Sequence, residues 1–173
     1  YDFPDRGFCM LVMELCPEGD MQHHIKKLRE EAAGNYSHPR EALRWIGQVF
    51  LALEHLHLQM NSLLRDLKPA NVVISERGIS KLTDFGFGRV GTETAGPWSF
   101  HGPPGSPGYI APEVLDQEAT DTRSDLYSFG VLVWVLLTGG VTVDPNPRPP
   151  LGKRRSENDY DALKRDWEKL QRC

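Results

Sequence analysis

The stretch LLRDLKPANVVI, residues 63–74, decides how the rest of the chain is interpreted. Three charged side chains, Arg65, Asp66 and Lys68, stand close together, and a proline and Asn71 follow before a purely aliphatic run. The aliphatic run is typical of a buried strand. Asp66 and Lys68 alternate with Leu67, so in an extended loop they project to the same side. Charges and an amide placed directly before a core strand indicate a chemical role for this loop.

A second carboxylate follows shortly after this loop. Residues 71–75 and 79–85 are typical of two short strands in a hairpin, because Glu-Arg-Gly separates them. Asp84 lies at the end of the second strand, and a nearby glycine lets the backbone turn sharply. We therefore expect the hairpin to bring Asp84 close to Asn71.

These side chains suit the binding of a hydroxyl, a phosphate and Mg²⁺. Asp84 and Asn71 offer the oxygen ligands that Mg²⁺ prefers, while substrate phosphates supply the others. Lys68 can neutralise charge on a transferring phosphoryl group. Asp66 can orient an attacking hydroxyl and accept its proton. Each piece alone has a simpler explanation, such as solvated charges in a turn.

Length and composition bound the remaining possibilities. The chain has 173 residues, which suits one domain or a large part of one. Its net charge of -4 does not indicate binding to nucleic acid or to an anionic membrane. No apolar run approaches the length of a membrane span. Three cysteines, odd in number and without metal-binding spacing, favour a reduced intracellular setting.

Periodicity and turn signals predict a mainly helical chain. The run 8–15 indicates a buried strand, and Asp20 is placed to cap a helix over 20–31. Ser37 is placed to cap the next helix, over 40–59. One broad apolar stripe is expected on that helix, made of Leu43, Ile46, Val49, Phe50, Leu53 and Leu56.

The second half of the chain is expected to hold one irregular loop and two helices. Residues 86–112 are rich in glycine and proline, which predicts a long loop of functional importance or without order. Residues 125–140 are apolar almost all round and predict a buried helix that ends at a glycine pair. The segment 141–173 reads as a Pro-rich, basic linker followed by an amphipathic helix. The apolar edge of that helix is Leu163, Trp167 and Leu170.

Several motifs occur in an order that resembles the eukaryotic protein kinases. RDLKPANVV, DFG, GSPGYIAPE and DLYSFGVLVWVLLTG follow one another at the approximate spacing of that family, from about residue 8 to about residue 140. Lys68 and the GSPGY segment are similar to the serine/threonine branch. TDFGF and PEGDM are most similar to the cyclic-nucleotide-dependent kinases.

The resemblance implies an α+β, protein-kinase-like fold. Residues 1–19 would form the end of the N-terminal lobe and the hinge, and residues 20–140 a mainly helical C-terminal lobe with short β hairpins. A catalytic loop over 64–71 and an activation segment over 84–113 would lie within that lobe. The N-terminal lobe is expected to be missing, because no glycine-rich loop or strand Lys precedes residue 8. The chain starts at Tyr1 rather than Met, so the rest of a parent chain would supply that lobe.

The resemblance also assigns roles to individual residues. Asp66 matches the catalytic Asp, Lys68 the phosphate-contacting Lys, and Ser106 the hydroxyl residue that bonds both. Asn71 and Asp84 match the metal ligands. The positions that match the ATP-binding residues of the hinge and ribose sites are Met13, Glu14, Cys16 and Asp20.

Further matches concern regulation and support of the loop. Arg65 matches an arginine that binds a phosphate on the activation loop, and Arg89 is placed to join it. Ser99 is the preferred phosphate acceptor over Thr92 and Thr94. Asp125 matches an aspartate that braces the backbone of the catalytic loop.

Two function classes stay open at this point. The first is ATP- and Mg²⁺-dependent phosphoryl transfer to Ser/Thr hydroxyls of protein substrates. The second is a kinase-like lobe, or a pseudokinase, that acts as a binding module. The intact catalytic and metal-binding positions favour an active parent protein. The resemblance implies an intracellular protein; the KRRS stretch at 153–156 leaves a nuclear signal open, although a solvated linker is favoured.

Overall fold

A computed structural model describes residues 2–3, 8–9, 11–32, 36–86, 88–90, 105–115 and 120–139 of the chain. The helices are α1 (Met21–Glu31), α2 (Ala42–Leu58), α3 (Pro112–Leu115) and α4 (Thr122–Thr138), with a 3₁₀ turn at Pro69–Asn71. The strands are β1 (Asp2–Phe3), β2 (Phe8–Cys9), β3 (Ser62–Leu63), β4 (Val72–Ile74), β5 (Ser80–Leu82) and β6 (Arg89–Val90).

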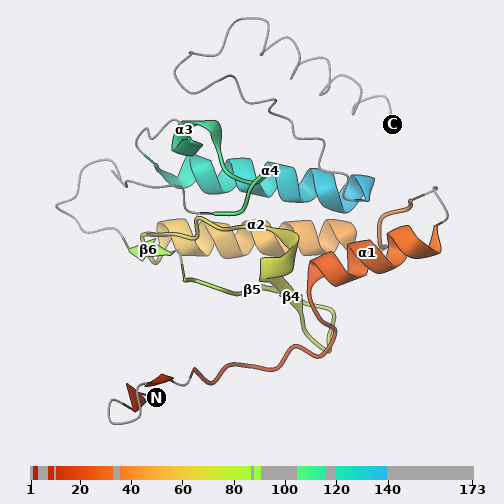
Figure 1. Cartoon of the computed structure of the whole chain (residues 1–173), viewed down its shortest axis with the longest axis horizontal. Helices are drawn as coiled ribbons and strands as arrows, with labels where there is room; N and C mark the ends of the chain where they lie inside the picture. Colours follow the sequence, from red (N-terminus) through yellow and green to blue (C-terminus); the bar gives the residue numbers. More distant parts are fainter. Residues whose placement is uncertain are drawn as a thin grey trace, which may run out of the picture.

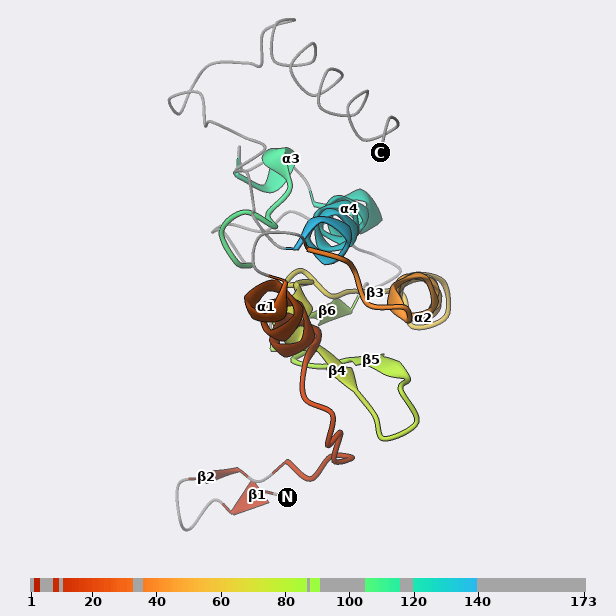
Figure 2. The same cartoon turned by 90° about the vertical axis from the view of Figure 1, so that its right-hand side faces the viewer.

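Two long helices form the frame of the described part. Figure 1 shows α2 and α4 side by side, with α1 at one end of the pair and the β4–β5 hairpin on the opposite side of α2 from α4. The core lies between these elements and is formed by buried side chains that include Met21, Ile25, Val49, Leu53, Leu64, Leu67, Val72, Leu132, Val135 and Leu136. Figure 2, which looks along the helices, shows the segment before α1 leading away from this core.

Helix α1 begins where the sequence predicts. The carboxylate of Asp20 accepts a hydrogen bond of 2.7 Å from the backbone N–H of His23, so Asp20 is the N-cap. Met21 and Ile25 lie one turn apart and are fully buried. The predicted helix over 20–31 is therefore confirmed.

Helix α2 is confirmed, but two details of its prediction are wrong. Its N-cap is Glu41, without a side-chain capping bond, because the chain turns at Pro39 and not at Ser37. Its buried stripe is Ala42, Trp45, Val49, Leu53 and Leu56. Leu43 and Phe50 were expected on the same stripe, yet they are exposed, because each residue turns the side-chain direction by about 100°.

The hairpin is confirmed in type and register. Strands β4 and β5 are antiparallel, with Val72 opposite Leu82 and Ile74 opposite Ser80. The turn between them contains Gly78 in the left-handed region, at φ +69°. The indole N–H of Trp45 donates to the carbonyl of Gly78 at 3.0 Å, which fastens the hairpin to α2.

Helix α4 begins three residues before its predicted start and ends at the predicted glycine. The Asp121 carboxylate caps it by accepting a bond of 2.8 Å from the backbone N–H of Arg123. Gly139 ends it in the left-handed conformation, at φ +87°. The prediction that α4 is buried all round is wrong in part, because Leu126 and Leu137 are exposed.

The prediction of a buried strand over 8–15 is also wrong in part. Only Phe8–Cys9 is a strand, and it pairs with Asp2–Phe3. The apolar side chains that follow are exposed, namely Leu11, Val12, Met13 and Leu15. The run is apolar enough for a core, but no face among the described residues covers it.

The remaining predicted segments are described only at their edges. Strand β6 pairs antiparallel with β3, which places the start of the loop over 86–112 beside the entry to the catalytic-loop sequence. Residues 91–104 and the linker and helix of 141–173 lie outside the described residues. Among the described helices, none is long and apolar enough to cross a membrane.

Candidate active site

The carboxylate of Asp66 is the centre of a compact polar cluster. Its Oδ1 accepts a bond of 2.8 Å from the hydroxyl of Ser106, and its Oδ2 accepts one of 2.8 Å from Nζ of Lys68. Nζ of Lys68 also donates to the Ser106 hydroxyl at 2.6 Å. Asp66 is only 3% exposed, so its charge is held by these partners rather than by water. The three residues that the sequence placed in catalysis therefore meet.

Asn71 joins the cluster from the 3₁₀ turn. Its side-chain NH₂ donates to the backbone carbonyl of Asp66 at 2.9 Å and to the carboxylate at 3.1 Å. Its backbone carbonyl accepts a bond of 3.0 Å from the N–H of Thr83, at the end of the hairpin. Both side-chain bonds use the NH₂ group, which leaves the side-chain carbonyl oxygen of Asn71 able to bind a metal.

Asp84 lies at the same end of the hairpin as Asn71. Val72, which follows Asn71, pairs with Leu82, two residues before Asp84. Asp84 itself has φ +58°, a conformation that costs free energy for a residue other than glycine and that is often found at functional sites. Its side chain is exposed, and Oδ1 accepts a weak bond of 3.3 Å from the backbone N–H of Gly86.

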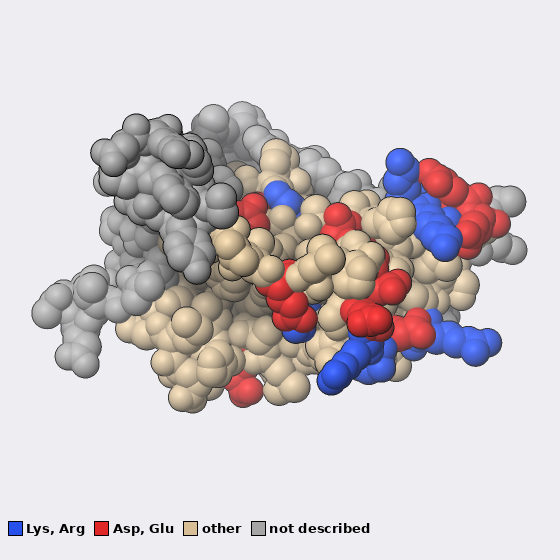
Figure 3. Space-filling model, turned by 90° about the horizontal axis from the view of Figure 1, so that it is seen from below, with Lys and Arg blue, Asp and Glu red and all other residues tan. Residues whose placement is uncertain are grey.

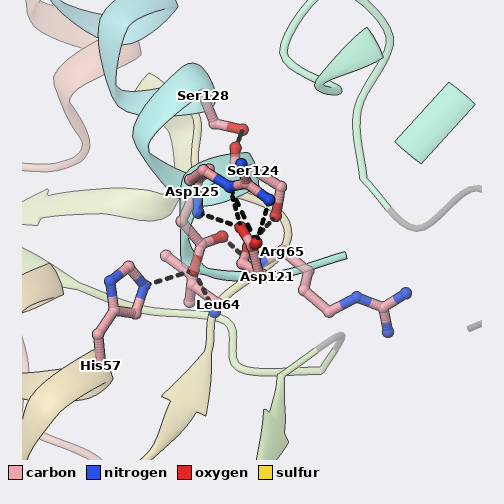
Figure 4. Close-up of polar contacts among 8 residues, drawn as sticks. His57, Leu64, Arg65, Asp121, Ser124, Asp125 and Ser128 are labelled. Atoms are coloured by element: carbon pink, nitrogen blue, oxygen red, sulfur yellow. Dashed lines mark hydrogen bonds and ion pairs between the residues drawn. The ribbon is translucent and has the colours of Figure 1, made fainter. Parts of the chain in front are cut away.

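The backbone before Asp66 is held by a buried carboxylate of α4. Asp125 accepts hydrogen bonds of 2.8 Å from the backbone N–H groups of Leu64 and Arg65 and from Nε2 of His57. Figure 4 shows these three bonds meeting on Asp125, while the side chain of Arg65 extends away. Arg65 has φ +70°, so the Asp125 bonds fix a strained turn directly before Asp66.

The comparisons with known proteins show the family of the chain. The model of the "Protein kinase domain" family matches residues 3–166. The chain belongs to the protein kinase family. It is 39% identical over 157 residues to human "Hormonally up-regulated neu tumor-associated kinase", covering 88% of this chain and 21% of the relative. A Xenopus laevis homolog of that kinase is 36% identical over 157 residues, with 88% and 24% covered.

A second kind of kinase matches as well. The Drosophila melanogaster "cGMP-dependent protein kinase, isozyme 2 forms cD5/T2" is 36% identical over 137 residues, covering 79% of this chain and 14% of the relative. The kinase chain thus spans about a quarter or less of the length of these three relatives. The family shown is that of the sequence-based prediction, and the relatives include a member of the cyclic-nucleotide-dependent type.

His57 belongs to the contacts around Asp125 and is absent from the residues that the sequence singles out. Its imidazole bonds Asp125 across the α2–α4 contact. The two residues are far apart in the chain, and no periodic pattern connects them. A signal for His57 would have been its place near the end of α2, directly before the catalytic loop.

The residues expected to bind ATP lie before helix α1 and at its cap. Met13 is exposed and Cys16 is half-buried. The carboxylate of Glu14 forms an ion pair of 2.5 Å with Nζ of Lys81, which ties the segment before α1 to β5. Asp20 bridges to Val73 through its backbone and uses Oδ1 as the α1 cap.

The residues expected to take part in regulation are described only in part. Arg65 lines a small, partly open space beside α4, together with Ile110, Ala111, Val114, Thr120, Ser124, Asp125 and Ser128. Arg89 pairs through its backbone with Leu63, and its side chain lies outside the described residues. Ser99, Thr92 and Thr94 also lie outside them.

Among the described residues, no group of three or more His, Cys, Asp or Glu side chains could hold a metal alone. The carboxylate of Asp84 and the amide oxygen of Asn71 fit Mg²⁺, provided that phosphate oxygens complete the shell. On the face seen in Figure 3, Lys and Arg side chains are interspersed with Asp and Glu.

Proposed function

We propose that the protein carrying this chain transfers the terminal phosphoryl group of ATP to Ser or Thr hydroxyls of protein substrates. The observation that supports this most strongly is the meeting of Asp66, Lys68, Ser106 and Asn71 around one buried carboxylate. The serine/threonine specificity rests on the Lys68 position and the GSPGY segment.

Asp66 acts on the substrate hydroxyl. Its two oxygens are held by Ser106, Lys68 and Asn71, but each carboxylate oxygen can accept more than one bond. A hydroxyl that donates to Asp66 is oriented for attack, and its proton passes to the carboxylate as the new bond to phosphorus forms.

Lys68 supplies positive charge beside the attacking oxygen. Its Nζ donates to Asp66 and to Ser106, which leaves one of its three N–H donors for a phosphoryl oxygen. Its side chain is partly buried, so its charge is less screened than that of a surface lysine. Lys68 therefore stabilises the charge that spreads over the transferring group.

Asn71 and Asp84 would hold Mg²⁺ together with ATP. The bound ion supplies neutralisation of the phosphate charge. Asn71 can contribute its amide oxygen because its NH₂ is already committed to Asp66. Asp84 is exposed, as a ligand for an incoming metal–nucleotide complex must be. Met13, Glu14, Cys16 and Asp20 belong to the proposed site of the adenosine moiety.

Residues 1–173 alone are expected to transfer no phosphate. They contain no glycine-rich loop and no strand Lys before the hinge, so nothing in this sequence covers the phosphates from above. The division into a hinge (1–19), a lobe (20–140) and a distal linker and helix (141–173) is part of the same proposal. So is a phosphate on Ser99 that binds Arg65 and Arg89.

The test is Asp66→Asn in the full-length protein. The change keeps the shape of the side chain and removes the proton acceptor, so phosphotransfer to a generic protein substrate should fall at least 100-fold. Glu76→Gln, the same change at an exposed carboxylate in the hairpin turn, should leave the rate unchanged. Retention of most of the activity in a folded Asp66→Asn protein would refute the assignment.

The same experiment separates the binding-module alternative. If the unmodified full-length protein binds ATP with Mg²⁺ but transfers no phosphate, the chain serves as a binding module. Comparing ATP binding with and without Mg²⁺ in Asp84→Ala tests the metal site independently. An unchanged Mg²⁺ dependence would show that Asp84 is not a ligand.

A further inference from the structure

The segment 13–20, here called the nucleotide segment, contains the residues that the proposed function assigns to the adenosine moiety of ATP. The backbone fixes its Asp20 end. The N–H of Ile74 donates to the carbonyl of Gly19 at 2.8 Å, and Asp20 bridges to Val73. Ile74 and Val73 both belong to strand β4, so the hairpin positions this end of the nucleotide segment.

The other end of the nucleotide segment is held by a charged contact. Leu11, Met13 and Leu15 are between 64% and 83% exposed, so apolar packing does not fix this end within the described part of the chain. The carboxylate of Glu14 instead meets Nζ of Lys81 on β5 at 2.5 Å. The two side chains are 60% and 38% exposed, respectively. This ion pair is therefore the contact that ties the Glu14 end to the hairpin.

The two attachments meet on one line across the hairpin. Val73, which bridges to Asp20, is also the register partner of Lys81. Directly opposite residues of an antiparallel pair have their Cα atoms only about 4.5–5.5 Å apart. Asn71 and Asp84 lie at the open end of the same hairpin, next to the paired residues of β4 and β5. One hairpin thus sets the position of both the nucleotide segment and the expected metal ligands.

We propose that Lys81 is a positioning residue for ATP. By holding Glu14, it keeps the nucleotide segment at the distance from Asn71 and Asp84 that a bound ATP–Mg²⁺ complex spans. Lys81 acts through Glu14 and makes no contact with ATP. This role rests on the proposed function, because it presupposes that the nucleotide segment receives the adenosine moiety.

The exposure of the pair determines the size of the effect. An ion pair between partly exposed side chains changes an equilibrium by about 2- to 5-fold. Without the pair, a smaller fraction of the molecules holds the nucleotide segment in the position that binds ATP, and the apparent affinity falls by that fraction. The residues that carry the chemistry, Asp66 and Lys68, keep their own contacts. The loss should therefore appear in KM for ATP and not in kcat.

The test is Lys81→Met in the full-length protein. The stem of Lys81 lines a cavity with Leu56 and Leu82, and Met keeps the length of that stem while removing the charge. We expect KM for ATP and the inhibition constant of adenosine to rise together, by about 2- to 5-fold, with kcat changed less than 2-fold. Adenosine has no phosphates, so its binding reports on the nucleotide segment alone.

Lys26→Met is the matched control. Lys26 forms an ion pair of 3.9 Å with Glu30 on α1, where both side chains are about two-thirds exposed. Removing this pair takes away the same charge from the same lobe and should leave KM for ATP and the binding of adenosine unchanged.

Exchange of the two charges separates pairing from general damage. Lys81→Glu places two carboxylates together and should raise KM for ATP more than Lys81→Met does. The double variant Glu14→Lys/Lys81→Glu restores an opposite pair and should return KM to within 2-fold of the unmodified protein. A double variant that binds ATP no better than Lys81→Glu alone would overturn the proposal.

Two other results would overturn it as well. A loss of ATP affinity without a loss of adenosine affinity would mean that Lys81 acts on the phosphates. A fall in kcat at an unchanged KM would mean that it acts on the chemical step. If the unmodified protein transfers no phosphate, the proposed function fails, but direct titrations of ATP and adenosine binding still decide the role of Lys81. Equal affinities of Lys81→Met and the unmodified protein in those titrations would refute it.

Discussion

Replacement of Asp125 by Asn is expected to loosen the catalytic loop and destabilise the lobe strongly. Asp125 is fully buried and accepts three hydrogen bonds, from the N–H groups of Leu64 and Arg65 and from His57. Asn has the same shape but presents an NH₂ in place of one carboxylate oxygen. In its better orientation it keeps the bonds to Leu64 and His57, and its NH₂ then faces the N–H of Arg65.

The magnitude follows from these contacts. One backbone donor and one side-chain NH₂ lose their partners, at about 1–3 kcal/mol each when buried. The two surviving bonds change from charge-assisted to neutral, which lowers their contribution by about 1 kcal/mol each. Because Arg65 is only partly buried, the low end applies to its N–H. We expect Asp125→Asn to lower the free energy of unfolding by about 4–6 kcal/mol, a large part of the stability of a domain.

The assay combines urea unfolding with local amide exchange. In Asp125→Asn the amide of Arg65 should exchange faster than expected from the global loss of stability. His57→Gln should cost less, and the double variant should be less destabilised than the sum of the single variants, because they share a bond. His55→Gln is the matched control, since His55 is exposed on the same helix. Unchanged stability and unchanged exchange at Arg65 would refute the reasoning.

Two further predictions concern the ends of helix α4. Gly139→Ala should lower the free energy of unfolding by at least about 1–2 kcal/mol, because φ is +87° and a Cβ would stand 2.5 Å from the ring of Tyr36. Gly47→Ala in α2 is the control in the same urea titration. It has open space at its Cβ and should raise the free energy of unfolding by about 0.5–1 kcal/mol. Asp121→Ala should lower it by about 1 kcal/mol at pH 7 through loss of the cap. The side-chain hydrogen bond from Arg123 lowers the pKa of Asp121. The charged carboxylate therefore contributes stability above a pH of about 4, and this contribution is lost as the pH falls further. Urea titrations at pH 7 and pH 3 should therefore show that Asp121→Ala and the unchanged chain differ less in free energy of unfolding at pH 3 than at pH 7. An equal difference at both pH values would contradict the cap.

Local signals in the sequence predicted local structure well. The cap at Asp20, the β4–β5 hairpin and the glycine at the end of α4 each depend on neighbours within a few residues. The cluster around Asp66 was also predicted, because the loop and the hairpin are consecutive in the chain.

Features that depend on distant partners could not be predicted in this way. The bond between His57 and Asp125 joins two helices, and the β3–β6 pair consists of two short strands on either side of the hairpin. Apolar character alone predicted burial of residues 11–15, whereas burial also requires a covering surface. Leu43 was placed on the wrong face for a related reason, since the sequence shows the width of the apolar stripe but not which part of it meets the core.

One turn of α4 explains how the two halves of the catalytic cluster are held in register. Asp125 fixes the backbone of the catalytic loop directly before Asp66, and the hydroxyl of Ser128 donates to the carbonyl of Tyr109 at 2.7 Å. The N–H of Tyr109 donates in turn to the carbonyl of Ser106 at 3.1 Å, so the segment that carries Ser106 is fixed to the same helix. Positions 125 and 128 are three apart and lie on one face of α4. The bond of 2.8 Å between Ser106 and Asp66 is thus supported from one rigid element, whatever the length of chain between them.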